Sequence, residues 1–427
     1  MKLLIIPKPV LNNELAVESY CFRFQKADEY LNTQKAGFYD GIINSPCLDV
    51  LEKVGLESFT NGQSIFVPIN NFTLLTDLNK QSLDSTDKII FLLSAKISTE
   101  EHYIERIKIL KEHGFRIALE PLSDIFKYDE IKPILELCNY IFINCMTADY
   151  REILQKLTIE YGHLLYVATD VNDLHTFIKI KNEGFNLFEG KFYCTPVTHG
   201  NKTISPIKVN YIQLLNIVRN EDFEIADVVK IVLQDASLSI SLLRFVNSPY
   251  LKLSQKIRTI QHAAAMMGQG ELRKWVTTAI SSTLVSDKPD EISKLSLMRA
   301  KFAENLAGCF EMGVHAQSLF LMGLFSILDV ALDVPMNEAL KEVTVSDNIY
   351  NALVYMEGSF SKILNFILQY ESAEWDEVYR LMIINNLNVE DIFEAYINAV
   401  SWYGSIISYI DDAEEDEIVE ETLATEQ

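Results

Sequence analysis

The sequence predicts a two-domain protein, in which an α/β domain is followed by an all-helical domain. In the first 200 residues, short apolar segments typical of strands alternate with longer segments of helical periodicity. From Tyr211 to about Ile410, nearly every apolar segment has a helical period. The segment 196–210, rich in Pro, Thr, Asn and Gly, separates the two patterns. We therefore predict a first domain at 1–200, a linker at 201–210, a second domain at 211–410 and a tail at 411–427.

The first domain is expected to contain a parallel sheet. Its clearest strand candidates are residues 88–95, 116–120, 140–145 and 164–170. They are continuously apolar, which indicates burial on both faces by covering helices. Between the first two candidates, a helical pattern at 100–114 ends at Gly114, and helices commonly end at a glycine. These alternating elements predict either a barrel or a doubly wound sheet.

Composition and charge argue against several classes of function. The formal net charge is -23, and nine negative charges lie in the tail, which we expect to be disordered and solvated. This acidic balance argues against a nucleic-acid partner. The apolar segment at 1–10 is too short for a membrane span and is expected to form the initial barrel strand. Since no apolar run approaches 18 residues, we expect a cytoplasmic protein without membrane insertion.

The chain lacks the short motifs that build cofactor or metal sites. It has no HExxH, no adjacent His-Asp pair, no CxxC, no GxSxG and no P-loop. Its six cysteines are scattered, which is typical of reduced core thiols. We therefore expect no cofactor and no metal site built from neighbouring residues.

Two segments of the second domain show how its helices are expected to form. One apolar stripe of a buried helix consists of Leu238, Leu242, Phe245 and Val246. In the next helix, Thr259 is expected to cap the start and Gly268 to mark the end.

The second domain resembles the HDOD domain. Residues 231–276 contain in order the patterns QDxSLS, LLRxVNS, IxxIxHA, MG and LRKWV. The segments LFLMGLFSILDVALDVPMNEAL, YESAEWDEV and AYINAVSWYG, at 319–340, 370–378 and 395–404, extend the match. Together these segments cover nearly all of 205–405 in sequence and spacing. The resemblance implies an all-helical domain related in fold to the HD phosphohydrolases.

The first domain resembles the EAL phosphodiesterases of cyclic di-GMP, which in bacterial proteins often precede an HDOD domain. The likeness lies in CFRF at 21–24, FVPINNF at 66–72 and FNLFEGKFYCTP at 185–196. It implies an N-terminal TIM-like (β/α) barrel of EAL type. It also implies the family's chemistry, in which carboxylates and an asparagine hold two divalent cations and a lysine lies nearby.

Most positions implied by that chemistry carry residues that bind no cation. The signature glutamate, the next glutamate, the lysine and the late glutamate fall at Ser19, Phe91, Phe142 and Thr169. Glu18 and Asp170 are each one residue out of phase, so Glu18 is expected on the opposite face of its strand. The paired aspartates become Glu120 and Pro121, and a third aspartate becomes Asn144. An oxygen-lined site for two cations cannot be built from this set.

Four vestigial candidates for ligand binding remain at matched positions: Arg23, Asn70, Glu120 and Glu189. Asn71 is the alternative register for Asn70, and Glu189 stands where the family has a glutamine. In the helical domain, the partner-binding candidates are Asp235, Arg244, Asn247 and His262. Structural roles compete with contact roles there, because Asp235 can cap a helix, Asn247 can bond a loop and His262 can pack in the core.

The resemblance therefore implies a catalytically inactive signal-transduction adaptor that acts through contacts with other signalling proteins. The pathways that it suggests are those of cyclic di-GMP, motility or surface attachment. An alternative is a receptor that binds cyclic di-GMP without hydrolysis, using Arg23, Asn70 and backbone donors. A third class, an active phosphodiesterase, needs the ligands that the sequence lacks. The oligomeric state is not indicated by any pattern.

Overall fold

The computed structural model describes residues 3–26, 46–76, 78, 86–122, 125–194, 213–218, 220, 222–234, 236–247, 257–284, 289–341 and 345–405. The chain divides into two compact units. The first combines Met1–Thr195 with Phe366–Ile397, and the second combines Pro196–Asn365 with Asn398–Gln427. Residues 366–397 thus cluster with the first unit, although the predicted domain at 211–410 includes them. The predicted linker and tail lie outside the described residues.

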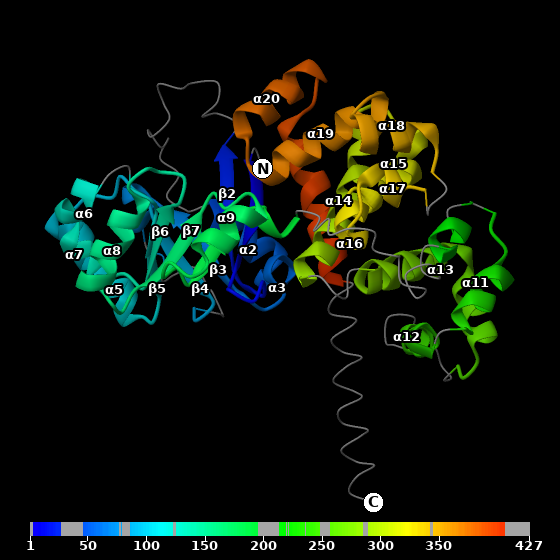
Figure 1. The fold of residues 1–427 in the computed structure, drawn as a ribbon, viewed down its shortest axis with the longest axis horizontal. Coiled ribbons are helices and arrows are strands. Elements are labelled where there is room, and N and C mark those ends of the chain that lie inside the picture. The colour runs from blue at the N-terminus through cyan, green and yellow to red at the C-terminus, as the bar shows by residue number, and fades with distance from the viewer. Residues whose placement is uncertain are drawn as a thin grey trace, which may run out of the picture. The chain divides into compact units, whose positions relative to one another are not determined.

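A closed eight-stranded barrel forms the centre of the first unit (Figure 1). Its strands are β1 Leu3–Leu11, β2 Val17–Lys26, β3 Ser64–Ile69, β4 Ile89–Leu93, β5 Arg116–Leu119, β6 Tyr140–Asn144, β7 Leu165–Thr169 and β8 Leu187–Glu189. Strands β2 to β8 are parallel, as predicted, whereas β1 runs antiparallel to both neighbours. The connection at 12–16 is too short for a parallel crossover, so β1 and β2 form a hairpin.

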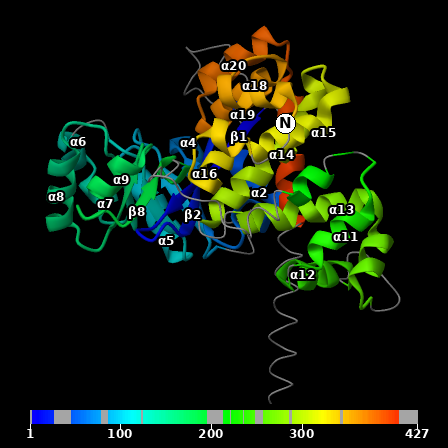
Figure 2. The ribbon, with the colours of Figure 1, turned by 45° about the vertical axis from the view of Figure 1, so that its right-hand side comes forward.

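Helices connect the parallel strands and cover the outside of the barrel (Figures 1 and 2). They are α2 Pro46–Val54, α3 Leu56–Thr60, α4 Asn71–Leu74, α5 Glu101–Glu112, α6 Ile125–Glu130, α7 Lys132–Leu135, α8 Tyr150–Glu160 and α9 Leu174–Ile180, followed by the 3-10 turn η2 Phe192–Cys194. The predicted helix at 100–114 is confirmed as α5. Gly114 follows it with φ 90°, the conformation that makes glycine a favourable helix terminator.

Side chains fill the interior of the barrel. Its buried cluster takes at least one residue from every strand: Val10, Cys21, Phe66, Ile90, Leu92, Ala118, Tyr140, Phe142, Val167 and Leu187. At the end where the parallel strands begin, Arg116 donates to Tyr140 Oη at 3.0 Å and to Ser64 Oγ at 2.7 Å. Arg116 thus ties three strands together at this end, whereas sites in (β/α) barrels lie at the opposite end, which we call the barrel mouth.

The second unit is helical. Its helices are α11 Ile225–Val232, α12 Ala236–Asn247, α13 Ile260–Leu284, α14 Asp290–Cys309, α15 Ala316–Phe325, α16 Leu328–Leu332, α17 Met336–Ala339 and α18 Asp347–Tyr355, with the 3-10 turn η4 Gly313–His315. Helix α19 Ser359–Ser372 spans the division between the units, and α20 Trp375–Ile384 belongs to the first. A last helical segment occupies 389–405.

The predicted helical details agree with these elements. Leu238, Leu242 and Val246 are buried in the core of the second unit, and Phe245 packs against it. Thr259 Oγ1 accepts from His262 N at 3.3 Å at the start of α13. Gly268 adopts φ 67° and kinks α13, so the predicted helix end is a break within one longer element. Within the described residues, no helix is both long and apolar enough to cross a membrane.

Helices α14 and α15 cross in close contact at a glycine. A Cβ atom on Gly323 would lie 2.4 Å from the carbonyl oxygen of Arg299, which is backbone and cannot rotate away. Ser296 Oγ donates to Leu324 O at 2.9 Å beside this crossing. The crossing distance of α14 and α15 therefore depends on the missing side chain.

We expect Gly323→Ala to lower the free energy of unfolding by about 1–3 kcal/mol, because the two helices must separate. Gly308→Ala in α14 is the matched control, since a Cβ there meets nothing within 4 Å. That control should be neutral or stabilise by up to about 1 kcal/mol, the helix propensity gain. Urea unfolding followed by circular dichroism measures both, and equal stability of the two variants would contradict the prediction.

Candidate functional site

The candidate site is the barrel mouth, where strands β2 to β8 end. The polar residues that point inward there include Arg23, Glu120, Asn144 and Glu189. Each follows a residue of the barrel core by two positions, and residues two apart on a strand share a face. The sequence marked Arg23, Glu120 and Glu189 as candidates at matched positions, but we did not expect its remaining carboxylates to converge; the structure places all three residues at this end of the barrel.

Arg23 and Glu189 form a bidentate ion pair across the mouth. Arg23 Nη2 lies 2.7 Å from Glu189 Oε2, and Nε lies 3.3 Å from Oε1. The side chain of Glu189 is only 6% exposed and that of Arg23 is 24% exposed. Their strands, β8 and β2, flank β1, so the pair links the two neighbours of the antiparallel strand. Bidentate geometry and burial make this a strong interaction.

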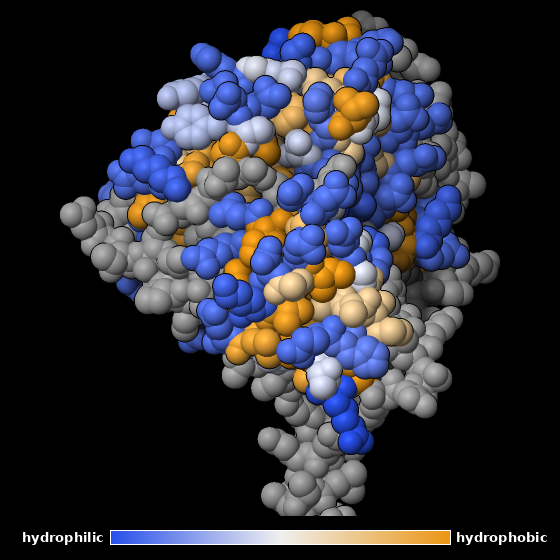
Figure 3. Space-filling view, turned by 90° about the vertical axis from the view of Figure 1, so that its right-hand side faces the viewer, coloured by the Kyte–Doolittle hydropathy of each residue, from blue (hydrophilic) through white to orange (hydrophobic). Residues whose placement is uncertain are grey.

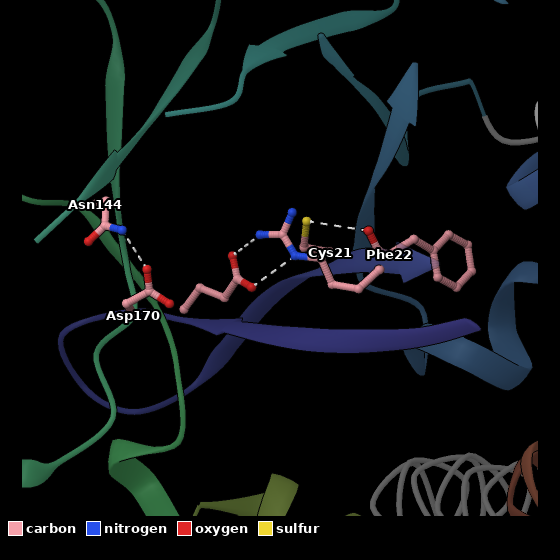
Figure 4. A network of polar contacts seen from close by, with 6 residues as sticks. Cys21, Phe22, Asn144 and Asp170 are labelled. Carbon is pink, nitrogen blue, oxygen red and sulfur yellow. Dashed lines mark hydrogen bonds and ion pairs between the residues drawn. The ribbon is translucent and has the colours of Figure 1, made fainter. Parts of the chain in front are cut away.

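Asn144 and Asp170 form a second pair at the mouth (Figure 4). Asn144 Nδ2 donates to Asp170 Oδ2 at 2.7 Å, and Asn144 Oδ1 accepts from Met146 N at 2.8 Å. Asp170 reaches Asn144 because its backbone is left-handed, with φ 62°. The next residue, Val171, donates its N–H to Glu189 O at 3.1 Å, so the two pairs are connected through the backbone.

The other two vestigial candidates are also engaged. Asn70 is the N-cap of α4, and its Oδ1 accepts from Phe72 N and Thr73 N, both at 3.0 Å. Glu120 Oε2 accepts from Ala95 N at 3.2 Å, which joins the ends of β4 and β5. Asn71, the alternative to Asn70, instead bonds Lys96 O and Ser98 N outside the mouth. Asn70 and Glu120 therefore both bind nearby backbone N–H groups.

The structure also places the residues at the lost ligand positions. Ser19 is buried on the inner face of β2, and its Oγ has no hydrogen-bond partner among the residues that the structure describes. Glu18 lies on the opposite face as predicted, and its Oε1 accepts from Asn12 Nδ2 at 2.8 Å. Phe91 points away from the barrel axis and packs on Phe115, because Ile90 and Leu92 take the inward positions of β4. The inward positions next to Phe91 are thus apolar as well, and β4 has no carboxylate.

Burial dominates the electrostatics beneath the mouth. Burial raises the pKa of the Cys21 thiol to about 12; nearby Arg23 opposes this change, while Glu189 and Glu120 reinforce it. For Arg23, burial works against the charge, but Cys21 and Glu189 more than offset it and the pKa of the guanidinium is raised. At the mouth, the permanent cation Arg23 thus lies near the acidic residues Glu189 and Glu120. The sequence did not indicate that the buried thiol of Cys21 lies close to these charges.

The mouth residues do not fit a pair of divalent cations. Such a site needs several convergent oxygen ligands, and here the side-chain oxygens of Glu189, Asp170 and Asn70 bind protein groups. The guanidinium of Arg23 adds a positive charge where cations would have to sit. Among the described residues there is also no group of three or more His, Cys, Asp or Glu arranged to hold a metal.

Of the four candidates in the helical unit, two are described in full. Asn247 bonds Leu243 O and both backbone groups of Ile257, at 2.6–2.8 Å, and so closes the connection between α12 and α13. His262 is exposed on α13, so of the two structural positions expected for it, in the core or at its rim, the core is excluded; its role in partner binding stays a prediction. Asp235 and the side chain of Arg244 lie outside the described residues.

Exposed apolar side chains are another feature of the helical unit. Leu233, the C-cap residue of α11, is 53% exposed, and Met266 on α13 is 52% exposed. The face of the molecule seen in Figure 3 carries groups of apolar residues between hydrophilic ones. Helices α11 and α13 contact each other, so these side chains belong to neighbouring elements. Such side chains are the common anchors of protein contacts.

Removing either member of the mouth ion pair should destabilise the protein strongly. Arg23→Met or Glu189→Leu leaves a largely buried partner uncompensated, and we expect a loss of about 2–4 kcal/mol. The double variant should recover part of that loss. The control pair is Arg151 and Glu183, which lie 2.6 Å apart with Arg151 58% exposed, and whose removal should cost less than about 1 kcal/mol. A double-mutant cycle by urea unfolding measures the coupling, and equal coupling for both pairs would refute this ranking.

The buried thiols should make stability fall in alkaline solution. Burial raises the pKa of Cys21 and of Cys138 to about 12, from 9.0 for an accessible thiol. The unfolded thiols lose protons above pH 9 while the folded thiols keep theirs, so rising pH favours the unfolded state, by up to about 1.4 kcal/mol per pH unit and thiol.

The same shift predicts selective alkylation. At pH 9, iodoacetamide should leave Cys21 and Cys138 unmodified in the native protein and modify Cys309, which is only partly buried. Mass spectrometry of the peptides measures this, and all three thiols should react in concentrated urea. Alkylation of native Cys21 as fast as Cys309 would show that the barrel interior is accessible.

Comparisons with known proteins agree with the predicted organisation. The chain is 27% identical over 412 residues to the uncharacterized protein YuxH of Bacillus subtilis, which covers 94% of this chain and 98% of that one. It is 27% identical over 317 residues to the cyclic di-GMP phosphodiesterase CdgJ of Vibrio cholerae, covering 74% of this chain and 73% of that one.

Solved structures similar to this chain include EAL domains. One is the FimX EAL domain of Xanthomonas citri in complex with c-diGMP, 12% identical, with a TM-score of 0.37 over 45% of this chain and 87% of that one. Another is a standalone EAL protein of Vibrio cholerae, 14% identical, with a TM-score of 0.35 over 44% and 89%. Residues 204–352 match the HDOD domain family. The chain therefore carries an HDOD domain in its C-terminal part, behind an eight-stranded barrel.

Proposed function

We propose that this protein is a cytoplasmic signal-transduction adaptor that does not hydrolyse cyclic di-GMP and that acts through protein contacts of its HDOD domain. The observation that carries the proposal is the state of the barrel mouth. Its inward-pointing polar groups bind one another or the local backbone, in the pairs Arg23–Glu189 and Asn144–Asp170. A site prepared for metal-assisted hydrolysis needs oxygen ligands directed at cations.

The chemistry of the replaced positions supports the same conclusion. Ser19, Phe142 and Thr169 occupy inner positions where the resemblance implies two glutamates and a lysine. Phe142 packs edge-on against Phe66, with ring centroids 5.0 Å apart, and fills the space below the mouth. Pro121 offers neither a side-chain ligand nor a backbone donor beside Glu120. Retention of a well-packed barrel without these ligands favours selection for a surface rather than for a reaction.

The likeness to CdgJ supports a pathway that involves cyclic di-GMP, since that relative is named as a phosphodiesterase of this nucleotide. We propose that the adaptor serves such a pathway, in control of motility or surface attachment. The exposed apolar residues of α11 and α13 support contact with another signalling protein. Leu233 and Met266 are the side chains that we assign to this contact.

A receptor that binds cyclic di-GMP without hydrolysis is the alternative, and the mouth geometry weighs against it. Arg23 is the cation that would meet a phosphate, and Glu189 already holds it through two hydrogen bonds. An anionic ligand would have to displace this buried carboxylate and leave it without a partner, which is costly. No contact of the described mouth favours the receptor over the adaptor.

Two measurements on the purified protein separate these functions. We expect no linear dinucleotide above a no-enzyme control when cyclic di-GMP is supplied with Mg²⁺ or Mn²⁺, because the mouth lacks the ligand set for metal-assisted hydrolysis. Calorimetry with the same nucleotide should show no saturable heat. Hydrolysis would refute the loss of activity, and saturable micromolar binding would favour the receptor.

Capture from cell extract tests the adaptor role. Tagged wild-type protein should recover a specific partner, and Leu233→Glu with Met266→Glu should abolish that recovery, because a buried charge is not tolerated at an apolar contact. The matched control is Ile159→Glu on α8, which changes a side chain 77% exposed on the barrel unit. Equal recovery by all three proteins would contradict the proposed contact surface.

A further inference from the structure

Strand β1 has a long side that β8 does not cover. The two strands pair only at Val10–Glu189 and Leu11–Phe188, because β8 spans three residues while β1 spans nine. Among the described residues, the rest of β1, from Leu3 to Pro9, has no strand partner on that side. Unpaired backbone groups inside a packed unit are costly, so this seam in the barrel needs another cover.

Two features of β1 lower the number of unpaired backbone groups along the seam. Ile5, Pro7 and Pro9 alternate along the strand, so their amide positions face the same side. The two prolines have no N–H to leave unpaired, which is why proline is found at strand edges. Ile5 has one, and Tyr370 Oη accepts from it at 3.2 Å and donates to Ile5 O at 3.0 Å. One hydroxyl of α19 thus satisfies both backbone groups of Ile5.

Tyr370 is held for this role by its surroundings. The residue is completely buried, and burial raises the pKa of its hydroxyl far above the usual value, so it stays a neutral donor and acceptor. Its ring packs against Phe366 on its own helix, against Trp375 of α20 and against Tyr396, with centroids 5.1–6.2 Å apart. The three helical segments at 366–397 therefore position one hydroxyl on β1.

A second contact fixes the same segment to the end of β8. Lys191 Nζ donates to Ser372 Oγ at 2.5 Å and to Leu368 O at 3.4 Å. Lys191 follows Glu189 by two residues, and Ile5 lies next to Ile6, the register partner of Arg23. The two contacts of 366–397 thus lie beside the two members of the mouth ion pair.

We propose that residues 366–397 form a strap that completes the wall of the barrel along β1 and keeps the Arg23–Glu189 pair closed. The strap replaces a strand on the uncovered side of β1 and joins it to the end of β8. Displacing the strap frees the edge of β1 and lets β2 and β8 separate at the mouth. This device does not depend on the adaptor function, since it follows from the contacts of the barrel alone.

Hydrogen exchange of the full-length protein tests the strap. Tyr370→Phe keeps the ring and removes the hydroxyl, so exchange of the Ile5 amide should become roughly 5- to 100-fold faster, the range for loss of a buried hydrogen bond. Alkylation of Cys21 on β2 should also become faster at pH 9, while that of Cys138 stays unchanged. Tyr355→Phe, at a site 59% exposed, is the matched control and should change neither rate.

A second variant keeps the proposal falsifiable if Tyr370→Phe does not fold. Ser372→Ala removes the hydroxyl that accepts the shorter of the two hydrogen bonds from Lys191. The rate of hydrogen exchange in the peptide 187–191 should then rise. Unchanged exchange of Ile5 in folded Tyr370→Phe, or of residues 187–191 in folded Ser372→Ala, would overturn the strap. Uniformly faster exchange across the second unit would also overturn it, because the hydroxyl would then serve global stability only.

Discussion

The ion pair between Arg23 and Glu189 is the interaction on which the barrel mouth depends. It joins β2 to β8 across the antiparallel strand β1. The pairing of β1 with β8 is itself limited to Val10 and Leu11 of β1. Because the side chain of Glu189 is nearly inaccessible, separating the two charges would leave a buried carboxylate without a partner and lower the stability of the fold. Two further contacts lie next to this pair: Val171 N–H donates to Glu189 O, and Lys191, two residues after Glu189, binds Ser372 of the strap.

The sequence predicted the fold well because continuous apolar strands and periodic helices leave few alternatives. It did not predict that Arg23, Glu120 and Glu189 lie at the same end of the barrel, because their strands are far apart in the sequence and only the closed barrel brings them together. It could not predict that Asp170 reaches Asn144, because that contact requires a left-handed backbone at a residue that is not glycine. The orientation of Phe91 could not be predicted either, since a uniformly apolar strand such as β4 shows no inward face in its sequence.

The assignment of 366–397 shows where sequence reasoning fails for another reason. The segment YESAEWDEV lies within the match to the helical family pattern, and its helical period is the same whichever unit it contacts. The contacts of Tyr370 with Ile5 and of Ser372 with Lys191 reveal that it belongs with the barrel. The first unit is therefore built from two segments that are far apart in the sequence.

The prolines of β1 have a further consequence for how the protein behaves when the strap is displaced. An exposed strand edge is usually a template for pairing with other chains and so promotes aggregation. Pro7 and Pro9 leave two gaps in the row of donors along this edge, so an incoming strand finds no continuous ladder. Opening of the barrel at this seam therefore exposes an edge that does not readily pair with other chains or promote aggregation. Such an opening can be reversible.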